Sequence, residues 1–331
     1  MTTEMAGDGK ESEIRMGIVG TDNTHAYQFA AFINGWSEKE PVPARLPNGV
    51  TIPSMHLWAL LLRRFEFDPL VDVPVSGARV TSIWSQDFAD GERVARACNI
   101  ERICRTPEAA CENVDAVMVL SEDPSTHLSY AQPALERGLP TFVDKPFARN
   151  VDEALAIFDL AARFGARCFT ASALRWCAQF ETARDYARSH LGPIKSVYVP
   201  CPGSLDLYGI HSVEIANFFL GSDVHAVQTI GVRDRQVTLL EYRDSTSALL
   251  EHLNFIRWPI YSATLFGSGW EHRANVDMPS ESILALVQEI VAFARGGCAP
   301  VPEAEAVRFI EIVAAARESL QSGRRIKCSP S

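Results

Sequence analysis

The chain has 331 residues, 47% of them hydrophobic and 22% charged, a balance that is typical of globular proteins with a sizeable core. This length predicts about two domains. The formal net charge of −10 argues against a nucleic-acid-binding protein, which needs a basic face, and favours a small molecule as the partner.

Residues 1–12 are polar and lack the apolar run of a signal peptide, so we expect a disordered tail on a cytoplasmic protein. No apolar run approaches the ~20 residues that a membrane span requires. The eight cysteines include no C-x-x-C pair, and we expect them to be reduced thiols.

The first half of the chain alternates between strand and helix patterns. Four short apolar segments have the pattern of buried strands, at 14–20, 79–84, 114–120 and 139–146. This alternation predicts βαβ units on a parallel sheet, with ligands at the carboxyl ends of the strands. We therefore expect Gly20, Ser85, Ser121 and Lys145 to line one edge of the sheet.

Two features depart from this alternation. Residues 36–77 are rich in proline and separate the first helix from the second strand, so we expect an insertion that is equally compatible with a lid or a surface decoration. After residue 190, short alternating segments predict antiparallel strands, and a helix over about 303–321 closes the chain. The predicted fold class is α/β, a parallel sheet followed by an α+β domain with an open, mostly antiparallel sheet.

Four segments of the chain, read together, resemble one known family. They are GIVGTDNTHA at 17–26, VDAVMVLSEDPSTHLSYAQPALERGLPTFVDKPFA at 114–148, LGPIKSVYV at 191–199 and YGIHSVEIANFFLG at 208–221. Their order is similar to that of the Gfo/Idh/MocA family, named for glucose–fructose oxidoreductase and inositol dehydrogenase. The resemblance spans roughly residues 13–328, with 36–77 as an extra segment.

The resemblance implies a Rossmann domain over 13–150 that holds NAD or NADP, and a substrate and oligomerisation domain over 151–331. It implies hydride transfer to or from a hydroxyl carbon of a sugar, a polyol or a related small molecule. It further implies a homodimer or homotetramer that binds neither nucleic acid nor a membrane.

Two residues are the expected proton-handling pair. Lys145 ends a strand before a proline, in Asp144-Lys145-Pro146, where the family usually has glutamate, lysine and proline. A lysine there can polarise a hydroxyl or take its proton, although a lysine at a strand end can also lie simply along the surface. His211 matches the histidine of the family, and Glu214, three residues on, could orient its ring.

One position of the expected catalytic set is changed. The family commonly has an aspartate four residues before this histidine, and here that position is Leu207. A shift of one residue in the loop could bring Asp206 or Tyr208 into the same space, and we keep both as catalytic candidates. Without such a shift the proton-handling set is incomplete.

The glycine-rich turn is also altered. In the pattern G-x-G-x-x-G, Gly20 fills the first glycine position, Asp22 the second and His25 the third. The Asp22 carboxylate should repel a pyrophosphate unless it turns away to cap the following helix, whose N-terminus still offers N–H groups to an anion. Ser85, at the end of the second strand, does not distinguish NAD from NADP. The predicted cofactor-binding residues are Gly20, Thr21, Asp22, Asn23, Thr24, His25, Ser85, Ser121, His127, Asp144 and Lys145.

Arg175 and Trp176 end a later strand and are substrate-binding candidates together with Glu214, with ordinary packing between the domains as the alternative for the first two. The histidines and cysteines do not have metal-ligand spacing, so no metal is expected. An NAD(P)-dependent oxidoreductase is the leading hypothesis. The alternatives are a lyase or hydratase of the same family and a non-catalytic small-molecule-binding protein.

Overall fold

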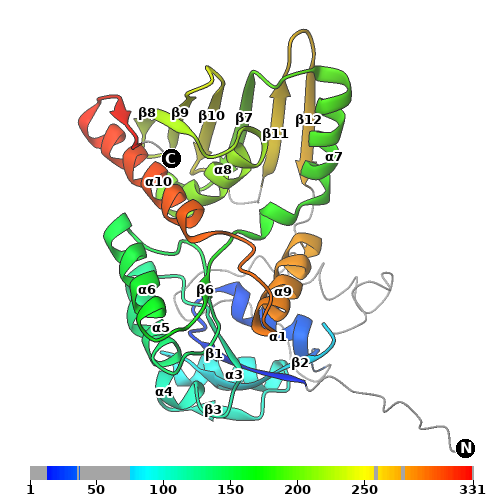
Figure 1. Ribbon diagram of the computed structural model, residues 1–331, viewed down its shortest axis with the longest axis vertical. Coiled ribbons are helices and arrows are strands. Elements are labelled where there is room, and N and C mark those ends of the chain that lie inside the picture. Colours follow the sequence, from blue (N-terminus) through cyan, green and yellow to red (C-terminus); the bar gives the residue numbers. More distant parts are fainter. Residues whose placement is uncertain (1–12, 36, 38–74, 257–259, 277–279, 330–331) are drawn as a thin grey trace, which may run out of the picture.

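The computed structural model describes residues 13–35, 37, 75–256, 260–276 and 280–329. They form two sheets at opposite ends of an elongated molecule, with helices between and around them (Figure 1). The expected tail at 1–12 and most of the expected insertion at 36–77 lie outside the described residues. Among the described residues, no helix combines the length and the apolar character that crossing a bilayer requires.

The first sheet is parallel throughout, as predicted. Its strand order is β3-β2-β1-β4-β5-β6, which places the β1–α1 turn at the point where the order reverses and where ligands bind in such sheets. The strands are β1 (Ile14–Val19), β2 (Ala78–Trp84), β3 (Arg102–Cys104), β4 (Ala116–Val119), β5 (Thr141–Val143) and β6 (Cys168–Phe169). Because β6 pairs in parallel with β5, this sheet continues beyond the boundary that we expected at residue 150.

Helices cover both faces of the first sheet, and side-chain caps fix where several of them begin. They are α1 (Thr24–Asn34), α3 (Phe88–Ala97), α4 (Pro107–Ala110), the short 3₁₀ helix η1 (Pro124–Thr126), α5 (His127–Leu135) and α6 (Val151–Arg163). Asn23, Asp87 and Asn150 each accept a hydrogen bond from a first-turn amide of the helix that follows, which satisfies donors that the helix itself leaves unpaired.

The second sheet has seven strands in the order β12-β11-β7-β10-β9-β8-β13. They are β7 (Ser196–Pro202), β8 (Val224–Val232), β9 (Arg235–Tyr242), β10 (Ser247–Leu253), β11 (Tyr261–Phe266), β12 (Glu271–Val276) and β13 (Ile326–Lys327). The central pair β7 and β10 is parallel and the other pairs are antiparallel, so the predicted mostly antiparallel sheet is confirmed.

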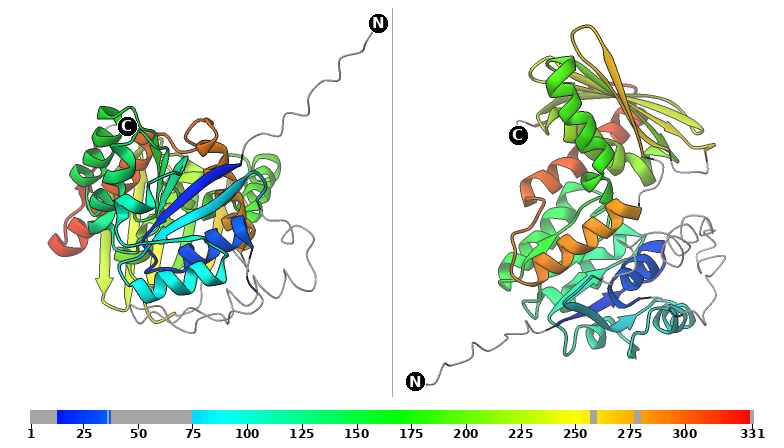
Figure 2. Two further views of the ribbon diagram at one scale, coloured as in Figure 1. Left: turned by 90° about the horizontal axis from the view of Figure 1, so that it is seen from below. Right: turned by 90° about the vertical axis from the view of Figure 1, so that its right-hand side faces the viewer.

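Helices α8 (Leu205–Leu220) and α10 (Glu303–Ser322) pack on one face of the second sheet (Figure 2). On the other face side chains such as Ile230 and Leu249 are exposed, which is the alternation of a sheet covered on one side. The 3₁₀ helix η2 (Ala173–Trp176), α7 (Ala178–Tyr186) and the single π turn η3 (Ala187–Leu191) connect the two sheets.

The chain then returns to the first sheet. Helix α9 (Ser280–Ala294) lies beside α1 (Figure 1), and the ring of Phe293 packs against Phe169 of β6 with 4.7 Å between centroids. Arg167, just before β6, donates to the backbone oxygen of Phe293. The two sheets are therefore joined by several chain crossings, and the carboxyl edge of the first sheet faces α8.

Candidate functional site

The β1–α1 turn has the geometry that the first glycine of a dinucleotide-binding turn provides. Gly20 has a φ of +95°, and a Cβ there would lie 3.1 Å from the backbone nitrogen of Ser121. Glycine is the residue that tolerates both the positive φ and this close approach of β1 to the end of β4. Helix α1 then begins at Thr24, with its N-terminus directed toward the carboxyl edge of the sheet.

Asp22, in the second-glycine position, does not cap α1. Asn23 is the cap, and its side chain accepts from the backbone nitrogen of His25 at 2.8 Å. The Asp22 carboxylate instead accepts from the backbone nitrogen of Glu122 at 3.0 Å and from Ser121 Oγ at 3.3 Å. The carboxylate is therefore turned into the loop that follows β4, and the helix cap that we considered as an alternative for Asp22 is made by Asn23.

Four predicted cofactor-binding side chains are buried within the scaffold. Thr21 and Ser85 hydrogen bond to each other through their hydroxyls at 2.6 Å, and this bond joins the ends of β1 and β2. His127 is fully buried, and each ring nitrogen lies 3.0 Å from a backbone oxygen, one of Phe147 and one of Ser121. These side chains, with that of Ser121, shape the edge and are not placed to touch a cofactor themselves.

The loop after β2 presents no carboxylate to a ribose. Asp87 caps α3 and accepts from the backbone nitrogen of Ala89 at 3.0 Å. Asp90 is fully buried, where it accepts from the hydroxyl of Tyr27 at 3.0 Å. Arg105, which follows β3 directly, is a cation near this loop that the sequence did not point to. Its guanidinium lies 3.6 Å from the ring centre of Phe88.

Asp144 is the centre of a hydrogen-bonded group at the end of β5. Its fully buried carboxylate accepts from His25 Nδ1 at 2.7 Å, Asn23 Nδ2 at 3.0 Å and the Lys145 backbone nitrogen at 2.8 Å. Burial alone would raise the pKa of Asp144, but the interactions with His25 and Lys145 lower it. Asp144 therefore stays ionised and fixes the side chains of the β1–α1 turn beside Lys145.

His211 lies on α8 with only 7% of its surface exposed, and its Nδ1 is 2.7 Å from Ser172 Oγ. Burial, and then the charges of Lys145 and His25, lower the pKa of His211 well below its ordinary value. The ring is consequently neutral at physiological pH. Because the charges of Lys145 and His25 act on this ring, the ends of β1 and β5 lie within electrostatic range of α8.

Glu214 does not orient His211 directly. Both of its carboxyl oxygens accept from the backbone nitrogen of Ser172, at 3.1 and 3.2 Å, and Ser172 in turn contacts His211. Burial raises the pKa of Glu214 to about 8, although the nearby Arg175 partly offsets this. Glu214 is 5% exposed, so it supports the site from behind and is not placed to bind substrate as we predicted.

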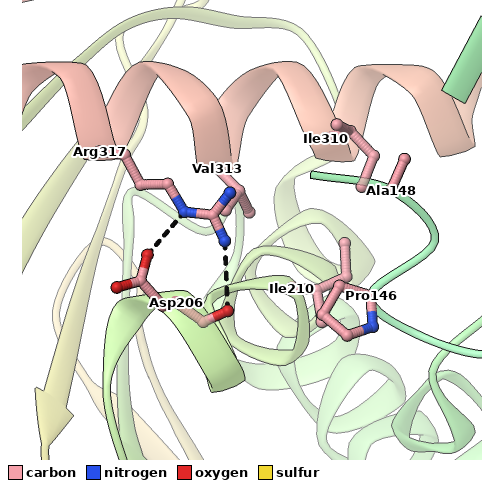
Figure 3. Close-up of a pocket in the computed structure, with 7 residues that line it drawn as sticks. All are labelled: Pro146, Ala148, Asp206, Ile210, Ile310, Val313 and Arg317. Carbon is pink, nitrogen blue, oxygen red and sulfur yellow. Dashed lines mark hydrogen bonds and ion pairs between the residues drawn. The ribbon is translucent and has the colours of Figure 1, made fainter. Parts of the chain in front are cut away.

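Helix α8 begins at Leu205, so the loop shift that we considered does not occur. Leu207 lies one helical turn before His211, in the family's aspartate position, and is 53% exposed. Asp206 turns the other way: its carboxylate accepts from Arg317 Nε at 2.8 Å (Figure 3). Asp206 is thereby excluded as a proton-handling group, whereas the Tyr208 ring stays near His211, 5.7 Å between centroids.

Figure 3 shows the narrow pocket beside this ion pair, between α8, α10 and the chain that follows β5. Its lining residues are Pro146, Ala148, Asp206, Ile210, Ile310, Val313 and Arg317. Arg317 also donates to the backbone oxygen of Arg149, so α10 fastens the segment after Lys145 to the start of α8. The pocket therefore belongs to the support behind Lys145.

Arg175 forms an ion pair with Glu305 and is 24% exposed, so it is not free to pair with a substrate carboxylate. Trp176 is half-buried and packs against the core. Packing between the domains, the alternative that we kept for this pair, accounts for both placements.

A comparison with known proteins adds an independent finding. The family model for Gfo/Idh/MocA proteins, described as "Oxidoreductase family, NAD-binding Rossmann fold", matches residues 59–172, which include β4, α5 and the Asp144-Lys145-Pro146 segment. The match covers about a third of the chain and agrees with the resemblance predicted from the sequence. The description of the family model includes NAD binding, in agreement with the predicted cofactor.

Individual relatives are distant. Inositol 2-dehydrogenase 2 of Saccharopolyspora erythraea is 23% identical over 219 residues, which are 61% of this chain and 64% of that protein. The structure of a putative myo-inositol dehydrogenase from Sinorhizobium meliloti superposes with a TM-score of 0.75 at 14% identity and covers 96% of this chain and 100% of its own. A scyllo-inositol dehydrogenase from Lactobacillus casei, with NAD(H) and scyllo-inositol bound, gives 0.72 at 14% identity and covers 96% and 99%.

The residues present fit a nicotinamide dinucleotide. Gly20 provides the close turn, the N-terminus of α1 offers backbone donors, and the Asp22 carboxylate is held by two donors of the β4 loop. Ser172 and the pairing of His25 with Asp144 are the functional contacts that our sequence argument missed. No local sequence pattern predicts these two contacts, because the partners are 39 residues apart for Ser172 and His211 and 119 residues apart for His25 and Asp144.

Proposed function

We propose that the protein is an NAD(P)-dependent dehydrogenase that oxidises a secondary hydroxyl of a cyclic polyol or sugar, or reduces the corresponding ketone. The observation that carries this proposal is the neutral, buried His211, which is held by Ser172 and lies within electrostatic range of Lys145, at the carboxyl end of β5. This is the edge at which such a fold presents a cofactor to a substrate.

The side chains of the site have separable tasks. Lys145 stands where it can hydrogen bond to the reacting hydroxyl and polarise its oxygen. The Nδ1 of His211 contacts Ser172, which fixes the ring orientation and leaves Nε2 for the substrate side. Tyr208, one turn along α8, adds an aromatic wall with a hydroxyl group. The nicotinamide, when bound, supplies the hydride acceptor or donor, and the turn around Gly20 with the start of α1 would hold its pyrophosphate.

The substrate class rests on the relatives and on the ion pair that engages Arg175, one of the predicted substrate-binding residues. The sequence relative and the two structural relatives described above are all named as inositol dehydrogenases. Arg175, the cation that could have paired with an acidic substrate, is engaged by Glu305. A neutral polyol is therefore favoured over a hydroxy acid.

An absorbance assay at the NADH and NADPH band tests the proposal. Purified protein with NAD⁺ or NADP⁺ is mixed with myo-inositol, scyllo-inositol and a panel of aldoses and alditols, and reduction of the cofactor is followed. Reduction with at least one polyol, lost in Lys145→Met, is expected. If the cofactor binds tightly but none of these polyols or sugars reduces it, the lyase or hydratase alternative is favoured instead.

The second candidate is a binding protein without redox activity. Two observations favour it: Leu207 stands in the position of the family's aspartate, and Asp22 keeps a carboxylate in the second-glycine position. Calorimetric titration with all four nicotinamide nucleotides decides between the two. If none of the four nucleotides at millimolar concentration gives a heat of binding, the dehydrogenase proposal is contradicted and the non-catalytic binding protein is favoured.

We also propose a homodimer or a dimer of dimers, formed by the uncovered face of the second sheet. Leu249 on β10 faces Leu239 on β9 and Tyr198 on β7 in register, and this row is open to solvent or half-buried. Apolar rows on a sheet face are usually covered. Light scattering at micromolar concentration should give a multiple of 36.5 kDa, and the monomer mass would contradict this assembly.

A further inference from the structure

Three departures from the family pattern lie in the site or within one helical turn of it. His25 stands in the third-glycine position, Asp144 replaces the usual glutamate, and Leu207 replaces the usual aspartate. The first two are in direct contact, with 2.7 Å between His25 Nδ1 and Asp144 Oδ2. We propose that His25, paired with Asp144, is a third proton-handling residue of the site and takes over the task of the carboxylate that position 207 lacks. This inference rests on the proposed dehydrogenase function.

The contacts of Asp144 determine which ring nitrogen of His25 can act. An ionised carboxylate only accepts hydrogen bonds, so Nδ1 carries the proton that it donates to Asp144. In the neutral ring the lone pair is then on Nε2, for which no partner is recorded in the described part of the chain. The His25 side chain is 16% exposed, whereas Asp144 is fully buried. One nitrogen is therefore anchored in the scaffold and the other is available to a bound molecule.

The ring of His25 is also held in one orientation. It stacks on Phe29, one helical turn along α1, with 4.9 Å between centroids and 14° between the ring planes. Asn23, the residue that caps the helix, donates to the same oxygen of Asp144. A side chain fixed by packing on one side and by a buried carboxylate on another is preorganised in the way that a catalytic group requires.

The charged and titratable groups around His25 come from two other elements. Asp144 and Lys145 come from the end of β5, and His211 comes from α8, where the charge of His25 helps to lower its pKa. Leu207 lies one turn before His211 on the same helix and is 53% exposed. The charge of His25 therefore acts on the part of α8 that carries position 207.

In the oxidative direction, the substrate O–H bond breaks and its proton goes to His25 Nε2, where a new N–H bond forms. The nicotinamide, when bound, would accept the hydrogen of the neighbouring C–H bond as hydride with its electron pair, and the carbon–oxygen double bond would form. The imidazolium that results is balanced by the Asp144 carboxylate, and its exposed edge can release the proton to water. In the reductive direction the same nitrogen returns the proton.

The alternative is that the pair of His25 and Asp144 has only a structural role and holds the β1–α1 turn against β5. His25→Asn separates the two readings, because its amide nitrogen mimics Nδ1 as a donor to Asp144 while nothing replaces Nε2. The matched control is His190→Gln, which changes a surface histidine. Each variant is measured for polyol oxidation, for NAD⁺ affinity by calorimetry and for thermal unfolding.

We expect His25→Asn to fold and to bind NAD⁺ as the wild type does, but to lose roughly 10²–10³-fold in kcat. Leu207→Asp should restore a large part of that loss in the His25→Asn background and change little in the wild type. Full activity of His25→Asn overturns the inference, and so does a loss that is explained by weaker NAD⁺ binding or that Leu207→Asp does not reduce.

A second readout does not depend on turnover. The His25 Nδ1 proton, bonded to a buried carboxylate, should give a proton NMR resonance far downfield of the amides that disappears in Asp144→Asn and persists in His190→Gln. Its absence from the wild type overturns the inference. If the wild type oxidises no polyol but shows this resonance, the proposed function fails while the pairing of His25 with Asp144 stands.

Discussion

Glu214 gives the protein a measurable dependence of stability on pH. In the unfolded chain this carboxyl ionises near its ordinary pKa of 4.5, whereas burial in the folded protein raises the pKa to about 8. Between these values the folded state holds one proton that the unfolded state has released. The stabilising contribution is therefore complete below pH 4.5 and is lost as the pH rises toward 8.

The size of the effect follows from the width of that window. One group with different pKa values in the two states changes the unfolding free energy by about 1.4 kcal/mol per pH unit between them. For Glu214 the window is between three and four units wide, so several kcal/mol are lost across it. Glu214→Gln removes the titration and retains an amide oxygen that can accept from the backbone nitrogen of Ser172.

The assay is urea unfolding of both proteins at pH 5, 6, 7 and 8. Near pH 5 the unfolding free energies should be similar, and at pH 8 the variant should be the more stable by several kcal/mol. Glu318→Gln, a change at an exposed carboxyl of α10, should run parallel to the wild type and serves as the control. If the difference between wild type and Glu214→Gln is the same at all four pH values, Glu214 is not a buried neutral acid and the reasoning is refuted.

Three further predictions follow from the site. Lys145→Met and His211→Ala should each lower polyol turnover by roughly 10²–10⁴-fold. The double variant should lose far less than the product of the two single losses, because the effects of groups that act as a unit are not additive. Full activity of His211→Ala contradicts this prediction. Gly20→Ala should lower the unfolding free energy by about 1–3 kcal/mol in denaturant titrations, because its φ is +95° and its Cβ would crowd Ser121; an unchanged midpoint contradicts it. Asp22→Asn keeps one acceptor oxygen for the backbone nitrogen of Glu122 but removes the charge, so calorimetry should show tighter NAD⁺ binding. Unchanged or weaker binding would mean that the carboxylate lies outside the field of the pyrophosphate.

The first sheet was predictable because its information is local. Each buried strand is a short apolar run that ends in a small or polar residue, and a helical pattern follows within a few positions. The position of β6 in that sheet and the parallel pairing of β7 with β10 were not, because they depend on which distant strands meet. Short-range alternation in a sequence predicts that a strand exists but not its partner.

The same distinction between local and long-range information applies to the residues of the site. Lys145 and His211 could be located from their place at a strand end and in a short motif. The side chains behind them could not: Asp206 turns to Arg317, 111 residues away, and Ser172 meets His211 across 39 residues. Such contacts are decided by how α8 and α10 dock, which no periodicity in the chain encodes.

Because the site depends on contacts between distant residues, a departure from a family pattern is hard to interpret from one position alone. Leu207 by itself suggests an incomplete proton-handling set, and His25 by itself suggests only an altered glycine-rich turn. In the structure His25 is bonded to a buried carboxylate next to Lys145, and its charge acts on His211, four residues after Leu207. A site that exchanges a carboxylate on one domain for an imidazole on the other keeps the number of groups able to move a proton. The three changed positions are then understood best as one rearrangement of the same chemistry.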